Sequence, residues 1–152
     1  MTGRRRLWRI LAAPLLIAIL IAGAAQPALA GGRSRRFQSE MLRLVNQTRE
    51  SHGLHAVSLN LRLSPEVWRH SQTMGRRFEL FHTSDVWTLV QPFGAHTWGE
   101  NVAYAATLRR VEQLWMQSYE HRVNLLNPNF RHAAIGVVKI RGWLWVTLQL
   151  YG

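Results

Sequence analysis

Apolar residues recur at helical spacing in three segments of the chain, residues 37–53, 64–78 and 107–121. In each segment they return every three or four positions, which places them on one face of a helix. The second segment opens on Ser64 and Pro65, a capping residue followed by a proline at the first helical position. The pattern therefore predicts three amphipathic helices.

Two apolar runs close the chain, residues 133–140 and 143–151, and the pair Arg141-Gly142 between them is typical of a two-residue hairpin loop. The second run carries large apolar residues at both odd and even positions, so that both faces of this strand need cover. Helices that precede a buried hairpin predict an α+β fold, in the form of a three-layer α–β–α sandwich.

Residues 81–99 interrupt these regular patterns. They contain Pro92, Gly94 and Gly99 and several hydroxyl side chains, without a sustained period. We expect a long loop here, with at most a short strand. Loops of this length often carry function.

The first thirty residues differ in composition from the rest. Four arginines precede an apolar run at 10–25, and small residues follow at 28–30, which is typical of a secretory signal peptide. We therefore predict a signal peptide over 1–30, a basic tail over 31–36, one domain over 37–152, and a secreted or periplasmic location. The alternative is that the apolar run stays uncleaved as an anchor, which would be the one expected contact with a membrane.

Charge and cysteine content narrow the function classes. The chain has 19 basic and 8 acidic residues, and removal of the first thirty residues, which hold four arginines, leaves 15 − 8 = +7. The basic residues are scattered and the chain is expected outside the cell, so we expect no nucleic-acid partner. The scattered charge is explained either by solvated helix faces or by attraction to anionic wall polymer or lipid. Cysteine is absent, which leaves histidines and carboxylates for any metal site.

Two local patterns place polar groups toward the interior. Helical spacing puts Ser118 and His121 on the apolar side of the third predicted helix. Glu100 stands two residues before the apolar stretch Val102-Ala103-Tyr104, which draws its carboxylate inward, and a buried carboxylate needs a partner. Thr83 and Ser84 are expected to cap a turn rather than attack a substrate.

Several motifs, in order, resemble the CAP superfamily, which groups cysteine-rich secretory proteins, venom allergens and pathogenesis-related plant proteins around an SCP-like domain. The resemblance covers residues 37–151, and the absence of cysteine fits the bacterial branch of the family. The matching segments are Phe81-His82-Thr83-Ser84, residues 98–103 (WGENVA), residues 115–130 (WMQSYEHRVNLLNPNF), Ile135-Gly136-Val137 and residues 145–149 (WVTLQ).

The resemblance implies an α–β–α sandwich with a cleft that holds two histidines and two acidic residues, and that binds a divalent metal in some members. By motif, His82 and His121 match the histidines and Glu100 matches the first acid. The second acid is replaced by Ser118. We expect His82, Glu100 and His121 to converge in one cleft.

Two interpretations of this cleft stay open. In one, His82, His121 and Glu100 bind Zn²⁺ and leave a fourth position to water, as in catalytic zinc sites. In the other, Glu100 only anchors both histidines by hydrogen bonds. Glu120 would point about 200° away from Ser118 on a helix and is a poor substitute for the missing acid. His96 is a possible extra ligand that no motif supports.

The resemblance implies a binding module at the cell envelope more than an enzyme, expected as a monomer, with lipid, sterol or cell-wall material as the ligand. Lipid and sterol binding belong to eukaryotic relatives and reach this chain by fold analogy alone. The alternative function is an extracellular hydrolase, a protease or esterase. In it, His82 or His121 acts as base, Glu100 orients it, and Ser118 or a metal-bound water attacks.

Overall fold

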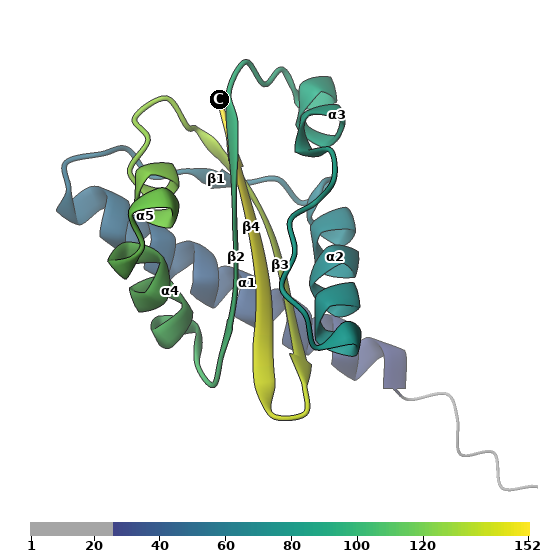
Figure 1. The fold of residues 1–152 in the computed structure, drawn as a ribbon. Coiled ribbons are helices and arrows are strands. Elements are labelled where there is room, and N and C mark those ends of the chain that lie inside the picture. The colour runs from purple at the N-terminus through teal and green to yellow at the C-terminus, as the bar shows by residue number, and fades with distance from the viewer. Residues whose placement is uncertain (1–25) are drawn as a thin grey trace, which may run out of the picture.

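The computed structural model describes residues 26–152, and the exposure of side chains from Ser34 on; over this range a four-stranded sheet lies between two helical layers (Figure 1). The strand order is β1-β3-β4-β2, in which β1 runs parallel to β3 and the other pairs are antiparallel. The elements are α1 (Gln26–Ser51), β1 (Ser58–Leu59), α2 (Ser64–Arg77), α3 (Val86–Val90), a 3-10 turn (Gln91–Phe93), β2 (Trp98–Ala105), α4 (Leu108–Gln117), α5 (Tyr119–Leu125), β3 (His132–Ile140) and β4 (Trp143–Tyr151).

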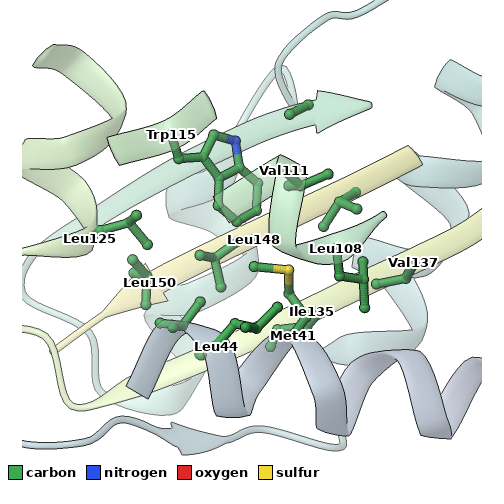
Figure 2. Close-up of a cluster of buried hydrophobic side chains, with 14 of the residues drawn as sticks. Met41, Leu44, Leu108, Val111, Trp115, Leu125, Ile135, Val137, Leu148 and Leu150 are labelled. Carbon is green, nitrogen blue, oxygen red and sulfur yellow. The ribbon is translucent and has the colours of Figure 1, made fainter. Parts of the chain in front are cut away.

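Alternation along the strands divides the core between the two faces of the sheet. Helices α1, α4 and α5 cover one face, and α2 and α3 cover the other (Figure 1). The larger apolar cluster lies under α1 and α4, where Met41 and Trp115 pack against Ile135 and Leu148 (Figure 2). On the other face, Gly136 lets the backbone of α2 approach β3 closely at Val67. The predicted three-layer α+β fold is confirmed.

The first helix is longer than its apolar pattern predicts. It begins at Gln26 instead of Phe37, so residues 31–36 continue the helix and do not form a separate tail. Three of these six residues are arginines, which are good helix formers and favour the extension. The predicted signal peptide falls for the most part on residues 1–25, outside the described residues, and stays a prediction.

The helix predicted over 107–121 is two helices. Thr107 caps α4 by accepting a hydrogen bond from the Arg110 amide, as its position suggests. Ser118 then adopts an extended conformation (φ −92°, ψ 127°) and separates α4 from α5. Helical spacing therefore does not place Ser118 and His121 on one face, because the chain changes direction between them.

The segment predicted as a long loop contains regular structure. Asp85 caps the short helix α3 by accepting from the Thr88 amide. Strand β2 then runs for eight residues from Trp98 and pairs with β4 along its whole length. The predicted hairpin turn at Arg141-Gly142 is confirmed, with φ values of 48° and 86°. Over residues 26–152, no helix combines the length and apolar character needed to span a membrane.

Candidate functional site

Glu100 lies on the edge strand β2, and its carboxylate is enclosed on the face covered by α2 and α3. The residue is 5% exposed. One carboxylate oxygen accepts from the Thr83 amide at 2.9 Å and lies 2.8 Å from His82 Nδ1. The other accepts from Thr83 Oγ1 at 2.6 Å and from Gln149 Nε2 at 3.0 Å. Gln149 reaches it because the β2–β4 register sets the two residues opposite each other. Four hydrogen bonds thus occupy the carboxylate.

These hydrogen bonds decide the charge of Glu100. Burial opposes its ionisation, but the bonds from Gln149, Thr83 and His82 outweigh burial and hold the pKa of Glu100 below its ordinary value. The carboxylate is therefore ionised at neutral pH and acts as an acceptor only.

His82 is fixed by this acceptor. Because an ionised carboxylate cannot donate, the hydrogen between His82 and Glu100 sits on Nδ1. In the neutral ring, Nε2 then keeps its lone pair. The side chain is 62% exposed, so Nε2 is free to meet a ligand from solvent. A carboxylate that orients the far nitrogen of a histidine is the usual outer contact of metal-binding imidazoles.

His121 approaches the same strand from the opposite helical layer. Its backbone carbonyl accepts from Asn101 Nδ2 at 2.9 Å, one residue from Glu100. Asn124 on the same helix donates to Asn101 Oδ1 and to the Glu100 carbonyl, and Gly99 leaves room for that side chain. These contacts fix α5 against the edge of the sheet.

The surroundings of His121 favour the neutral ring. Burial, and secondly the nearby His82, lower the pKa of His121. Both residues flank β2, because His82 contacts Glu100 and the His121 carbonyl accepts from Asn101, the next residue of that strand. One comes from the segment after α2 and the other from α5, on opposite sides of the sheet (Figure 1).

The predicted set of site residues is only partly joined. His82 and Glu100 are hydrogen-bonded, whereas no bond links His121 to Glu100. Anchoring by Glu100 therefore applies to one histidine and not to both. Within residues 26–152, no group of three or more histidine and acidic side chains is arranged to hold a metal ion. Coordination of a metal by Glu100 would require the carboxylate to give up one of its four hydrogen bonds to protein donors.

The remaining candidates lie outside this bonded group. Ser118, partly exposed at the break between α4 and α5, shows no hydrogen bond from its Oγ to either histidine in the described part of the chain. Glu120 is exposed. His96 is exposed, and its backbone amide donates a hydrogen bond to the Gly152 carbonyl. Its ring forms no hydrogen bond with Glu100.

The sequence did not indicate that Thr83 and Gln149 donate hydrogen bonds to the Glu100 carboxylate. Thr83 was expected only to cap a turn, yet both its amide and its hydroxyl bind the carboxylate. Gln149 is a polar residue in the middle of an apolar strand and is fully buried, which was an available signal. The partner of Gln149 could not be read from the sequence because it depends on strand register.

A half-buried histidine, His70, lies behind the site. His70 on α2 hydrogen-bonds Thr147 Oγ1 at 3.0 Å and meets Phe81 edge to face. Its Nε2 is buried without a hydrogen-bond partner within the described residues. Burial lowers the pKa of His70, although Glu100 and the His82 carbonyl act in the opposite direction. The ring is therefore suited to packing as a neutral group.

A cavity of about 760 Å³ lies elsewhere, between α1, β1 and α2. Its walls combine apolar side chains with two arginines, and none of the predicted site residues is among them. The lining residues are Ser34, Arg35, Gln38, Ser39, Leu59, Leu61, Ser64, Pro65, Trp68 and Arg69. The His82–Glu100 pair is thus separate from this cavity.

A four-stranded sheet between two helical layers, with histidines beside a glutamate on its edge strand, is the architecture of an SCP domain. Residues 42–150 match the sequence profile of the cysteine-rich secretory protein family, CAP. The chain belongs to this family, as a cysteine-free bacterial member.

Relatives support the same assignment. An uncharacterized protein of Bacillus subtilis, YkwD, is 32% identical over 123 residues, a match that covers 76% of this chain and 47% of the relative. The chain therefore spans about half of that protein. An extracellular SCP-domain protein of Bacillus anthracis has a similar fold, with a TM-score of 0.71 and 22% identity over 86% of this chain and 45% of the other. An outer surface protein of Borrelia burgdorferi also has a similar fold, with a TM-score of 0.68 and 14% identity over 76% of this chain and 92% of the other.

Proposed function

We propose that this protein is a secreted binding module whose ligand contact is the surface between His82 and His121, and that it is not an enzyme. The observation that carries the proposal is the bond from His82 Nδ1 to the buried Glu100 carboxylate, which leaves Nε2 exposed and oriented. The extracellular and outer-surface proteins of similar fold support a location outside the cytoplasm. Lipid, sterol and wall-polymer ligands stay predictions.

In this proposal zinc is held by two imidazoles, because four protein donors already occupy the Glu100 carboxylate. His82 and His121 would hold the ion, and Glu100 would act only by fixing the His82 ring. The surroundings that lower the pKa of His121 keep its ring neutral, which metal binding requires. A bound Zn²⁺ would supply open coordination positions for an anionic or carbonyl oxygen of a ligand.

Zinc titration calorimetry on the purified protein tests this proposal. We expect one Zn²⁺ per chain at pH 7.5, with affinity reduced at least tenfold by His82→Ala and by His121→Ala. His55→Ala, which alters an exposed histidine outside the site, is the matched control and should bind zinc normally. Affinity should fall in acid, because a protonated imidazole cannot bind zinc. Equal zinc affinity in all four proteins would refute the site.

Ser118→Glu separates the binding module from the hydrolase. It restores an acid where the fuller family pattern has one, so zinc affinity should rise about tenfold if the side chain reaches the site. Under the hydrolase alternative, the same change and Ser118→Ala both remove a nucleophile and should abolish turnover. We expect no cleavage of ester or peptide substrates by the wild type. Wild-type cleavage that Ser118→Ala abolishes would overturn the non-enzymatic proposal.

A further inference from the structure

The sheet extends beyond the end of α2 and leaves part of one face uncovered. Helix α2 ends at Arg77, whereas the β3–β4 hairpin continues past it to the end of the molecule opposite α3 (Figure 1). Three aromatic side chains and one arginine gather here, and we name them the hairpin-end patch: Phe78, Tyr104, Arg141 and Trp143. The three rings are 42–43% exposed. Clustered exposed aromatic residues mark interaction surfaces more often than single ones do.

The patch is held in place by contacts among its own members and with a buried ring. Tyr104 meets Trp143 edge to face at 5.6 Å and stacks on the buried Trp145 at 4.6 Å. Phe78 contacts Trp145 edge to face at 5.5 Å, and the Arg141 guanidinium lies 4.5 Å from the centre of the Phe78 ring. The exposed groups are therefore ordered before any partner arrives, which lowers the entropy cost of binding.

Backbone conformation singles out the same residues. Over residues 26–152, the two non-glycine residues with positive φ are Phe78 (56°) and Arg141 (48°), and they contact each other. Phe78 follows α2 at the position where glycine is preferred, and Arg141 opens a turn where asparagine or glycine costs less. Both residues thus adopt a left-handed backbone conformation that is unfavourable for a side chain other than glycine or asparagine. Strain of this kind clusters at functional sites, so we attribute it to a use for the two side chains.

Charge around the patch has one dominant sign. In the segments 76–81 and 141–143, three basic residues (Arg76, Arg77 and Arg141) stand against one acid (Glu79), and all four are exposed. Arg77 also packs over the ring of Phe81 at 5.4 Å. We therefore expect the partner of this surface to be anionic and to have an apolar region in which aromatic rings can be buried.

We propose that the hairpin-end patch docks on the surface of an anionic phospholipid bilayer. Tyrosine and tryptophan favour the boundary between headgroups and acyl chains, because each has an apolar body and a polar tip. The flanking arginines would face lipid phosphates, to which guanidinium groups bind in pairs of hydrogen bonds. A projecting hairpin suits insertion between headgroups, whereas a polymer chain is better held in a groove. The proposal does not depend on zinc binding at His82 and His121.

Vesicle co-sedimentation tests the proposal on the full chain, with phosphatidylcholine vesicles that contain or lack 30% phosphatidylglycerol. Arg141→Asn creates a favourable Asn-Gly turn, so it should leave stability unchanged or raised while it weakens binding to the anionic vesicles about fivefold. Trp143→Ala should weaken binding by a similar factor. Phe78→Gly relieves the backbone and should also weaken binding. Two controls lie away from the patch, Arg43→Gln on α1 and Trp87→Ala on α3, and should bind as the wild type does.

Each outcome decides the proposal. Loss of anionic-vesicle binding in the three patch variants, with normal binding in both controls, supports it. Equal binding by all six proteins would overturn it, because attachment through any other part of the chain does not depend on Arg141. Absence of vesicle binding, together with binding to a soluble anionic wall polymer that Arg141→Asn weakens, would also overturn it and assign the patch to that polymer.

Discussion

Replacement of Arg49 by methionine should lower the free energy of unfolding by about 4 kcal/mol. This guanidinium is fully buried, and no carboxylate in the described part of the chain forms an ion pair with it. It donates instead to four backbone carbonyls, those of His55, Leu125, Asn127 and Phe130, at 2.8–3.1 Å. The bonds join the end of α1 to the segment between α5 and β3. Methionine fills the space and leaves the carbonyls buried without donors, which accounts for the size of the loss.

Urea unfolding, followed by circular dichroism, measures this effect. Arg43→Met is the matched control, because Arg43 lies on the same helix and is exposed. Its effect should stay within about 0.5 kcal/mol. Burial, and secondly Arg131, lower the pKa of Arg49, but the side chain remains charged in the folded protein at neutral pH. If Arg49→Met and Arg43→Met unfold at the same urea concentration, the guanidinium does not fix these segments.

Glu100→Gln should cost about 3 kcal/mol at pH 7, with a loss that disappears in acid. All four groups that contact the carboxylate can donate. The NH2 group of a glutamine would face either His82 Nδ1 and the Thr83 amide, or the Thr83 hydroxyl and the Gln149 amide. The pKa of Glu100 is lowered in the folded state, so its stabilising contribution is complete above the unfolded value of about 4.5. It is lost as pH falls through the lower folded value.

Thermal unfolding between pH 3 and pH 7 tests this prediction. The difference between wild type and Glu100→Gln should be largest above pH 5 and should shrink toward pH 3. Glu50→Gln, at an exposed position of α1, should follow the wild type at every pH. A difference that stays constant over the whole range would mean that Glu100 is not an ionised acceptor in the folded protein.

The regular parts of the fold could be predicted from the sequence because each has a one-sided apolar pattern. Helix α2 and the β3–β4 hairpin follow directly from such patterns. Apolar patterns did not predict strand β2, because Glu100 and Asn101 are polar yet buried and their hydrogen-bond partners come from distant segments. The break between α4 and α5 at Ser118 could not be predicted for a related reason. Bonds from Asn124 to β2 set the direction of α5, and no local signal marks them.

The site was identified by its motifs more than by its local pattern. Apolar neighbours showed that Glu100 needs a partner, and the family resemblance named His82 and His121. Neither the local pattern nor the motifs predict the hydrogen bonds that the Glu100 carboxylate accepts from protein donors. Those bonds depend on the strand register that sets Gln149 opposite Glu100. The proposed zinc site therefore uses the two imidazoles as ligands, with Glu100 behind the His82 ring.

Nitrogen-15 NMR of the histidine rings during zinc addition tests the proposed site most directly. Before zinc, His82 should show a protonated Nδ1 and an unprotonated Nε2, as its bond to Glu100 requires. On zinc addition, the Nε2 signal of His82 and one ring nitrogen of His121 should shift together, while Nδ1 of His82 keeps its hydrogen. Rings that do not respond to zinc, or a His82 that binds zinc through Nδ1 and abandons Glu100, would contradict the proposed site.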